Sequence, residues 1–459
     1  MRYHALACDY DGTLAPHGSM SPETRAALAR LRAAGRRVLL VTGRRLADLE
    51  EVCPDLSVFD AVVAENGATY SHPPGAPPRL LAPAPPEAFF DRLRARGVTP
   101  LDHGAVIVAT VQPHEVEVVE AIRALGLELQ IIFNKGAVMV LPSGVNKASG
   151  LEFALTDLGL SRHEVVGVGD GENDHAFLAH CELSVAVADA VPSLAEAADV
   201  VTRGGAGAGV VELAQALLDE DARLLTPRRR RHLVPLGLRS DATPFAVPPR
   251  DGTILCVGED DAARSALLAE VVQRLAEKRY QCCLIDPAGG PRARADAVVM
   301  GAANRAPALE EVTAALAAPG RHVMVNLAAL APREHPVFTG LLLGRLAELR
   351  ARVGRPHFIL IDRAEQVLPA EGAAVPEGLV LATRAPARLP PRVRASTTLV
   401  LAAGSGPARA LDAAAEALSR PPPRAHEVTL AAGEALAWPL AAAAEPPFPL
   451  RLIATAPAP

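Results

Sequence analysis

The sequence predicts an α/β protein with two units, each built on a parallel sheet that is covered by helices. Short apolar runs such as 5–8 and 38–41 alternate with longer stretches of helical apolar spacing. This alternation stops near residue 222 and starts again near residue 251. Because the chain has 459 residues, its length also suggests two to three domains.

The first predicted strand, residues 5–8, runs directly into Asp9-Tyr10-Asp11-Gly12-Thr13. Ligands of open α/β sheets bind at the carboxyl ends of parallel strands, where these two carboxylates would lie. Together they can bind a divalent cation, and a carboxylate there can attack phosphorus. Taken alone, the pair is equally well explained as a helix cap or as two solvated acids.

Three further segments have the same form, a polar group at the start of a turn or helix. Thr42-Gly43 follows the strand 38–41 and offers a hydroxyl and backbone N–H groups to an anion, although it also fits an ordinary helix N-cap. Lys147 opens an apolar helical pattern, where a lysine is often only solvated. Asp170 begins a second acidic cluster after the buried strand 165–169.

With these four segments in order, residues 1–222 resemble the haloacid dehalogenase-like phosphatases, and most closely their Cof-type, class IIB branch. The resemblance implies a Rossmann-like parallel sheet with an inserted α+β cap, and phosphomonoester hydrolysis through an aspartyl-phosphate. It implies Asp9 as the nucleophile and Asp11 as the acid that protonates the leaving alcohol and then activates water. It further implies that Thr42, with Gly43, binds the transferring phosphoryl group and that Lys147 neutralises charge.

The same resemblance implies one Mg²⁺, held by Asp9, Asp170 and the backbone carbonyl of Asp11. Asn173 and Asp174 are then supporting residues that orient the metal and the lysine. Asn66, in a Glu-Asn-Gly loop after an apolar strand, is expected beside the phosphate, although Asn-Gly is also an ordinary turn.

The cap is expected at about residues 72–138, with helices near 86–96 and 114–125 and strands near 106–111 and 128–133. Such a cap is short for this branch, which favours a small phosphorylated acid or sugar as substrate. Its basic side chains are possible anion contacts, but they are assigned no substrate role, because most basic residues on a small domain are solvated: Arg92, Arg94, Arg96, His103, His114 and Lys135.

Residues 223–250 are rich in Arg and Pro and are interpreted as an interdomain linker. Its four consecutive arginines, 228–231, could bind nucleic acid or an anionic membrane surface. The formal charge of −6 for the whole chain favours the solvated linker instead. Residues 419–459 are expected to be a loosely ordered tail, rich in Pro and Ala, that adds a strand or two.

Residues 251–418 resemble a P-loop ATPase of the HerA/FtsK-like type whose nucleotide site has decayed. Gly258 begins a loop with phosphate-loop spacing that ends at Ser265, but Arg264 replaces the lysine and two acids lie inside the loop. Asp362, after an apolar strand, resembles the acid of a Walker B strand. An ordinary turn in another doubly wound domain is the alternative. We predict that this half does not hydrolyse ATP, because acids in the loop repel triphosphate.

Composition sets further bounds on location and partners. No apolar run reaches the roughly 18 residues that cross a bilayer. No signal peptide is expected, because the first predicted strand begins at residue 5. Six cysteines without Cys-x-x-Cys spacing suit reduced thiols in a cytoplasm, and no zinc is expected. The expected partner is a small phosphorylated metabolite. Two other functions remain open, a regulatory or scaffold protein and a nucleic-acid-associated ATPase.

Overall fold

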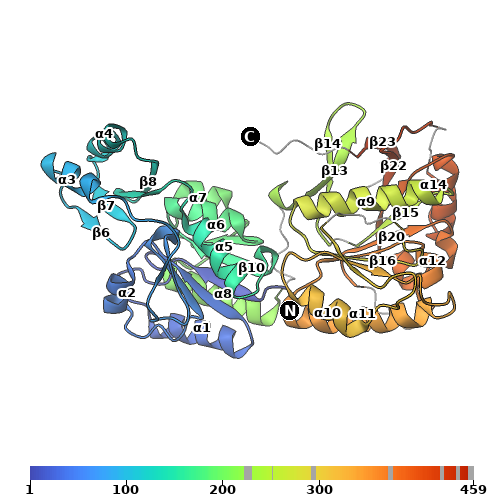
Figure 1. Cartoon of the computed structure of the whole chain (residues 1–459), viewed down its shortest axis with the longest axis horizontal. Helices are drawn as coiled ribbons and strands as arrows, with labels where there is room; N and C mark the ends of the chain where they lie inside the picture. Colours follow the sequence, from blue (N-terminus) through green and yellow to red (C-terminus); the bar gives the residue numbers. More distant parts are fainter. Residues whose placement is uncertain are drawn as a thin grey trace. The chain divides into compact units, whose positions relative to one another are not determined.

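The structure is a computed structural model that describes residues 1–221, 230–250, 252–290, 296–370, 376–423, 428–440 and 445–452. The chain divides into two compact units, Met1–Arg228 and Arg229–Pro459. Each unit is an α/β structure with its own sheet (Figure 1). No helix among the described residues is both long enough and apolar enough to cross a membrane.

The first unit is built on an eight-stranded sheet with the order β12-β11-β10-β1-β2-β3-β4-β5. The strands from β12 to β3 are parallel, and β4 and β5 extend one edge in antiparallel pairing. The predicted α/β fold class is therefore confirmed for this unit. Its strands are β1 (Ala5–Cys8), β2 (Arg37–Val41), β3 (Ala61–Ala64), β4 (Thr69–Ser71), β5 (Arg79–Leu80), β10 (Val165–Gly169), β11 (Leu183–Ala186) and β12 (Val200–Val201).

Side chains alternate across this sheet, so each strand supplies apolar groups to two cores. Leu6 and Cys8 of β1 pack towards one core together with the helices α1 and α8, and Ala5 and Ala7 pack towards the other core with α5 and α6. A strand buried on both faces explains the uninterrupted apolar run 5–8. The helices are α1 (Pro22–Ala33), α2 (Leu46–Val52), α5 (Lys147–Asp157), α6 (His175–His180), α7 (Pro192–Ala197) and α8 (Ala206–Asp219).

The cap is a small antiparallel sheet with the order β6-β7-β9-β8, and α3 and α4 cover one of its faces. Its elements are α3 (Glu87–Ala95), β6 (Asp102–His103), β7 (Val108–Val111), α4 (Glu115–Leu125), β8 (Leu129–Asn134) and β9 (Ala137–Pro142). The expected interval 72–138 is wrong at both ends. β5 pairs in the main sheet, and β9 continues to Pro142. The apolar run 137–141 was missed as a strand because its hairpin turn is only two residues long.

The second unit contains an eleven-stranded sheet with the order β14-β13-β23-β22-β21-β15-β20-β19-β16-β18-β17. The strands from β21 to β17 are parallel, and β22, β23, β13 and β14 continue the sheet in antiparallel pairing. The strands are β13 (Val234–Arg239), β14 (Pro244–Val247), β15 (Thr253–Val257), β16 (Cys282–Asp286), β17 (Val298–Met300), β18 (Val323–Asn326), β19 (Phe358–Ile361), β20 (Leu379–Thr383), β21 (Thr397–Ala402), β22 (Glu434–Pro439) and β23 (Phe448–Arg451).

One face of this sheet packs on α9 together with side chains of β13, and the other face packs on α10, α11, α12 and α14. The helices are α9 (Asp261–Glu277), α10 (Leu309–Ala317), α11 (His335–Val353), α12 (Ala364–Val367), α13 (Pro391–Ala395) and α14 (Pro407–Ala417). The loop that begins at Gly258 lies between the strand β15 and the helix α9.

Residues 234–247 are not a linker, which corrects the interpretation of 223–250. They form the hairpin β13–β14, in which Val234 and Leu236 are fully buried. The register shifts between Pro235 and Gly237, and this irregularity hid the alternating pattern in the sequence. Of the arginine run, Arg228 and Arg229 lie outside the described residues. The segment expected as a tail supplies β22 and β23 to the same sheet.

Candidate active site

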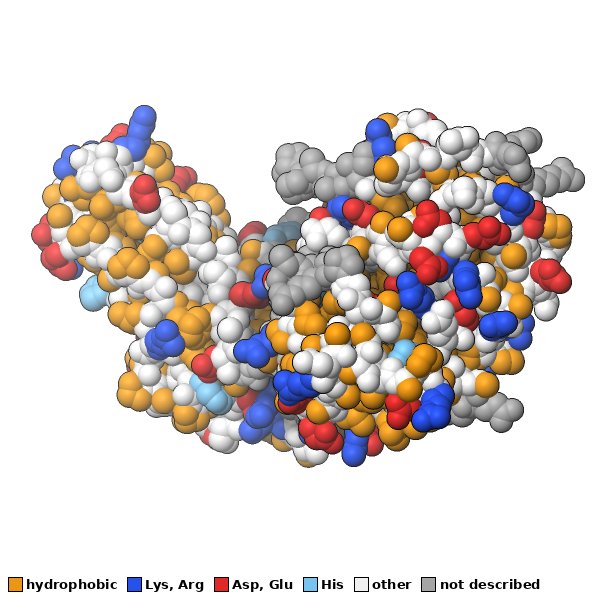
Figure 2. Space-filling model, turned by 45° about the vertical axis from the view of Figure 1, so that its right-hand side comes forward, with side chains coloured by type: hydrophobic (Ala, Val, Ile, Leu, Met, Phe, Trp, Pro, Cys, Tyr) orange, Lys and Arg blue, Asp and Glu red, His pale blue; other side chains and the backbone are white. Residues whose placement is uncertain are grey.

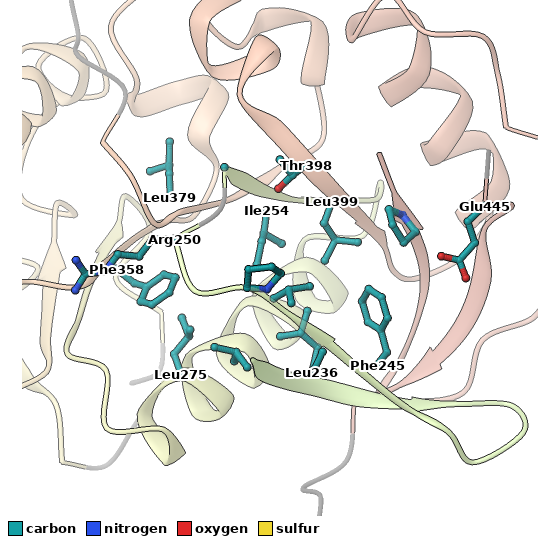
Figure 3. Close-up of a pocket in the computed structure, with 16 residues that line it drawn as sticks. Leu236, Phe245, Arg250, Ile254, Leu275, Phe358, Leu379, Thr398, Leu399 and Glu445 are labelled. Atoms are coloured by element: carbon teal, nitrogen blue, oxygen red, sulfur yellow. The ribbon is translucent and has the colours of Figure 1, made fainter. Parts of the chain in front are cut away.

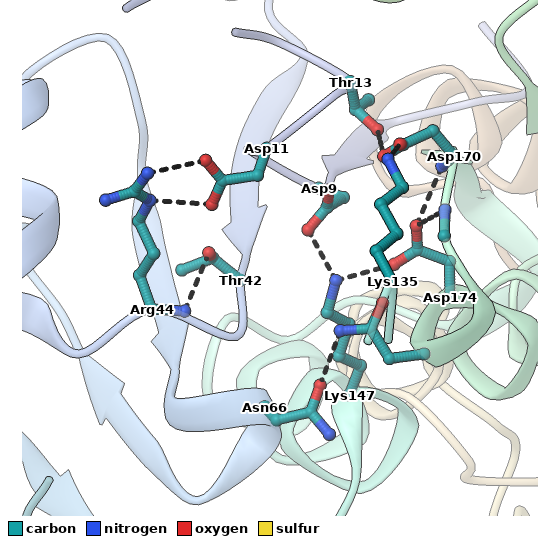
Figure 4. Close-up of polar contacts among 12 residues, drawn as sticks. Asp9, Asp11, Thr13, Thr42, Arg44, Asn66, Lys135, Lys147, Asp170 and Asp174 are labelled. Atoms are coloured by element: carbon teal, nitrogen blue, oxygen red, sulfur yellow. Dashed lines mark hydrogen bonds and ion pairs between the residues drawn. The ribbon is translucent and has the colours of Figure 1, made fainter. Parts of the chain in front are cut away.

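The ends of β1 and β10 bring two of the predicted acids together. These strands are neighbours in the sheet, so Asp9 and Asp170, which follow them, lie at the same edge (Figure 4). Gly12 turns the chain away with a φ of +81°, and a Cβ built there would lie 2.2 Å from Asp170 Oδ2. Glycine is therefore required at position 12 both by the backbone angle and by the close approach of the Asp170 carboxylate.

Lys147 lies between two carboxylates in the interior of the site. Its Nζ donates to Asp9 Oδ1 at 2.5 Å and to Asp174 Oδ1 at 2.6 Å, and its side chain is only 1% exposed. Lys147 is the first residue of α5, where Asn146 caps the helix by accepting from two backbone N–H groups. The Asn146 N-cap fixes the residue at which α5 begins. It thereby places the Lys147 side chain beside the end of β1, where its Nζ contacts Asp9.

Burial and charge oppose each other at this pair. Burial raises the pKa of Asp9, Asp174 and Asp170 raise it further, and Lys147 lowers it, with a net rise well above the usual range. Burial lowers the pKa of Lys147, but its two carboxylate partners outweigh burial and the pKa is raised. The lysine is therefore held as a cation, and its charge favours the ionised form of Asp9 against the burial and the neighbouring carboxylates that oppose it.

Asp170 is held by groups from two other segments. Thr13 Oγ1 donates to its Oδ1 at 2.8 Å, and the ammonium of Lys135, from the cap, pairs with its Oδ2. Asp174 Oδ2 accepts from the backbone N–H groups of Asp170 and Gly171, at 2.8 and 2.9 Å, and so shapes this loop.

The carboxylates of Asp9, Asp170 and Asp174 each offer an oxygen within 4.8 Å of the others. Oxygen ligands from carboxylates are the type that Mg²⁺ prefers. A cation, the Lys135 ammonium, already pairs with Asp170 in this structure, so the residues present fit a bound cation. Asp174, expected only as a supporting residue, lies within this cluster.

Asp11 does not join that cluster. Its carboxylate accepts two hydrogen bonds from the Arg44 guanidinium, both 2.7 Å long, and it is 46% exposed. Arg44 follows Thr42 and Gly43 after β2, so this pair bridges the ends of β1 and β2. The Asp11 carboxylate is therefore accessible to solvent, unlike the buried carboxylates of Asp9, Asp170 and Asp174.

Thr42 and Asn66 come from the ends of β2 and β3. The Thr42 hydroxyl is buried and accepts from the backbone N–H of Arg44 at 3.1 Å. Asn66 Oδ1 accepts from Asn173 Nδ2 at 3.1 Å, and Asn66 Nδ2 has no hydrogen-bond partner among the described residues. A Cβ built at Gly43 would lie 3.6 Å from Asn173 Nδ2, so these four residues lie together.

Sequence reasoning assigned no function to three residues of the site, Thr13, Arg44 and Lys135. Thr13 and Arg44 each adjoin a recognised motif, so their position beside Asp11 and Gly43 was a usable signal. Lys135 carried a weaker signal, an Asn-Lys-Gly turn between two strand-forming runs. Only the folded cap places its side chain at Asp170.

The loop at Gly258 in the second unit is occupied by its own side chains. Arg264 is 1% exposed, and its guanidinium bonds to the Gly258 carbonyl and to the Asp261 carboxylate. Asp260 accepts from the first backbone N–H groups of α9, at 2.8 and 3.3 Å. Ser265 Oγ donates to Asp362 Oδ2 at 2.7 Å. The groups that would hold a phosphate are thus bonded to one another.

An apolar cavity of about 210 Å³ also lies in the second unit, between the hairpin β13–β14 and the strands β15 and β21 of the same sheet (Figure 3). Leu236 and Phe245 from the hairpin face Ile254 and Leu399 there. None of the predicted phosphatase residues lines it. It lacks the converging carboxylates that the site in the first unit has.

Comparison with known proteins gives the family. The family described as haloacid dehalogenase-like hydrolase matches residues 6–75 and 109–213. The phosphoglycolate phosphatase of Methanothermobacter thermautotrophicus is 32% identical over 218 residues, which are 45% of this chain and 96% of that protein. The phosphoglycolate phosphatase of Pyrobaculum aerophilum is 32% identical over 231 residues, 48% of this chain and 99% of that protein.

A solved haloacid dehalogenase-like hydrolase from Bacteroides thetaiotaomicron is 20% identical and covers 47% of this chain and 99% of its own, with a TM-score of 0.40. The two phosphatases match over almost their full length, and the family match spans the segments that carry Asp9, Thr42, Lys147 and Asp170. This chain therefore belongs to the haloacid dehalogenase-like hydrolases, as a phosphatase of that family.

Proposed function

We propose that the first unit is a Mg²⁺-dependent phosphomonoesterase that acts on a small phosphorylated metabolite through an aspartyl-phosphate on Asp9. The observation that carries this proposal is the buried arrangement of Lys147 between Asp9 and Asp174, with Asp170 at the same edge. Such an arrangement holds a nucleophilic carboxylate beside fixed positive charge, which a dianionic phosphate needs in order to approach.

In the proposed reaction, an Asp9 carboxylate oxygen attacks phosphorus while Lys147 and the Thr42 segment bind the phosphoryl oxygens. Asp11 protonates the leaving alcohol and then takes a proton from the water that hydrolyses the aspartyl-phosphate. For Asp11 to transfer these protons, the Arg44 guanidinium must share or release the carboxylate that it now binds through Nε and Nη2. Asp9 and Asp170 would hold the Mg²⁺, with the Asp11 backbone carbonyl. The ion would supply charge that offsets nucleophile and substrate.

The cap supports a small substrate. It consists of four short strands and two helices, and its Met139 side chain approaches Gly43 of the phosphate segment. Both relatives named above are phosphoglycolate phosphatases, which makes phosphoglycolate the first ester to test. A sugar phosphate is the second.

The test is phosphate release by the purified full chain from phosphoglycolate and hexose phosphates, with Mg²⁺ or with EDTA. Asp9→Asn is the inactive variant, and Arg92→Gln, at an exposed position on α3, is the matched control. We expect turnover with Mg²⁺ that is lost in EDTA and in Asp9→Asn but kept in Arg92→Gln. Folded protein that releases no phosphate from any ester would favour a regulatory or scaffold function instead.

For the second unit we propose a P-loop-type fold, over about residues 251–418, that does not hydrolyse ATP. The strand order β21-β15-β20-β19-β16 and the contact of Ser265 with Asp362 support the fold, since these two residue types hold Mg²⁺ in P-loop proteins. The buried Arg264 and the acids at 260 and 261 support the absence of hydrolysis. Calorimetry of the full chain with Mg²⁺ and ATP should show no binding; tight binding would contradict this proposal.

A nucleic-acid-associated ATPase is the less favoured alternative for the second unit. On the face of this unit drawn in Figure 2, the described Lys and Arg side chains are interspersed with Asp and Glu. Mixed charge of this kind lacks the one-sign field that binds phosphate backbones. A salt-dependent shift of labelled DNA by the full chain, lost on replacing Arg228 to Arg231, would revive this alternative.

A further inference from the structure

The hairpin between β8 and β9 of the cap has an unusual residue at its tip. Asn134 pairs with Ala137, so Lys135 and Gly136 form a two-residue turn, with φ values of +47° and +86°. Turns with two positive φ angles favour Asn, Asp or Gly at both positions. A lysine adopts this backbone at a cost, and such costs are concentrated where the side chain has a function.

The tip binds the loop that follows β10 in two ways. The backbone N–H of Lys135 donates to Glu172 Oε2 at 3.2 Å, and its ammonium pairs with Asp170 Oδ2. The Lys135 side chain is 48% exposed, whereas Asp170 is 3% exposed. The ammonium therefore lies at the entrance of the site and reaches inwards to a buried carboxylate (Figure 4).

The contact of Lys135 with Asp170 competes with cation binding. Asp170 Oδ1 accepts from Thr13, so Oδ2 is the oxygen that faces the Lys135 ammonium. A divalent cation held by Asp9 and Asp170 would repel an ammonium at the same oxygen. The hairpin backbone remains tied to Glu172, so the displaced ammonium would stay at the entrance of the site.

Few other groups near the entrance compete for that ammonium. The carboxylates with the largest electrostatic effect on the Lys135 ammonium are Asp170, Asp9 and Asp174, all of which belong to the carboxylate cluster. The Glu172 carboxylate already accepts the Lys135 backbone N–H, and Asp11 is paired with Arg44. An ammonium freed from Asp170 would therefore face the substrate.

We propose that Lys135 determines specificity: it pairs with Asp170 while no divalent cation is bound, and binds a carboxylate on the leaving group of the substrate once the cation occupies Asp170. This inference rests on the proposed function and narrows its substrate class to phosphorylated acids. The ammonium makes no covalent bond. It exchanges one carboxylate partner for another.

The first experiment compares phosphoglycolate with ethyl phosphate, which has a methyl group in place of the carboxylate. We expect the wild-type chain to have a higher kcat/KM for phosphoglycolate than for ethyl phosphate. In Lys135→Gln the ratio of these two kcat/KM values should fall by roughly 10- to 100-fold, mainly because KM for phosphoglycolate rises. A loss of this size corresponds to one charge-assisted hydrogen bond. Lys135→Arg should restore part of the preference, and Arg92→Gln should keep all of it. An unchanged preference in Lys135→Gln overturns the inference while the phosphatase function stands.

The second experiment measures Mg²⁺ binding by calorimetry without substrate. Lys135→Gln should bind Mg²⁺ several-fold more tightly than the wild-type chain, because Asp170 has lost a competing cation. A purely structural lysine would leave the affinity unchanged or weaken it, and either result overturns the inference. If the wild-type chain hydrolyses neither ester but releases phosphate from a hexose phosphate, the carboxylate specificity fails and the proposed function stands; if it hydrolyses none of these esters, both fail. Calorimetry then decides alone whether Lys135 and the cation compete.

Discussion

Replacing Lys147 by methionine tests the centre of the site. The lysine and its partners Asp9 and Asp174 expose 1%, 7% and 0% of their side chains, and the two Nζ to oxygen distances are 2.5 and 2.6 Å. Methionine keeps the length and the apolar stem, so the variant removes the charge and its hydrogen bonds and leaves little cavity. Removing one partner of a buried ion pair costs about 3–5 kcal/mol. We expect a loss of that size in the free energy of unfolding of the first unit, measured in EDTA.

The assay can separate the two units. Trp438, the only tryptophan, lies in β22 of the second unit, so its fluorescence follows that unit, whereas circular dichroism follows both. In Lys147→Met, the unfolding transition of the first unit, which circular dichroism detects and Trp438 fluorescence does not, should move to a lower denaturant concentration. The transition followed by Trp438 fluorescence should stay in place. The double variant Lys147→Met with Asp174→Asn should recover part of the loss, because it leaves one unpaired carboxylate instead of two. A loss below about 1 kcal/mol would refute the buried ion pair.

Three further predictions follow from other contacts. Glu65 accepts the backbone N–H groups of 105, 106 and 107 at 2.7–2.9 Å and ties the cap to the core, so Glu65→Gln should cost about 1.5–3 kcal/mol and speed hydrogen exchange at these amides. Hydrogen exchange at the amides of 105–107 that is no faster in Glu65→Gln than in Glu87→Gln, a control at an exposed position, would contradict this prediction. Mg²⁺ at 100 times its Kd should stabilise the first unit by about 2.7 kcal/mol, and Asp170→Asn should remove most of that gain; an equal thermal shift in this variant would contradict the assigned cation site. Burial raises the pKa of the Cys256 and Cys283 thiols from 9.0 to about 12, so the unfolded second unit binds fewer protons than the native one across this range. The stability of the second unit should therefore fall as pH rises from about 9 to 12, by up to about 1.4 kcal/mol per pH unit for each thiol. The measurement is the urea concentration at the midpoint of unfolding, followed by Trp438 fluorescence; a midpoint that does not change with pH over this range would contradict the prediction.

The hairpin β13–β14 illustrates why part of the fold was not predictable. Its residues carry an alternating apolar pattern that Pro235 and Gly237 interrupt, and arginines precede it in the chain. A strand whose register shifts at a bulge cannot be recognised by a period of two alone. The pairing that stabilises it is with β23, more than 200 residues away in the sequence, and no local pattern reports such a partner.

The sequence by itself determined the α/β class of the first unit and the edge of the sheet at which its polar residues meet. This was possible because buried parallel strands appear as short apolar runs, and the residue after each run must lie at the carboxyl edge. Asp9, Thr42 and Asp170 could therefore be assigned to one site by position alone, and Lys147 joined them as the first residue of a helix. Their chemical roles remain predictions.

The tertiary structure alone decided which partner each charge has. It pairs Asp11 with Arg44, places Lys147 between Asp9 and Asp174, and brings Lys135 from the cap to Asp170. The physical reason is that an ion pair depends on distances of a few ångströms between side chains whose residues are 27 to 138 positions apart. Such distances are set by how the sheet, the helices and the cap pack together, and the residue types alone do not encode them.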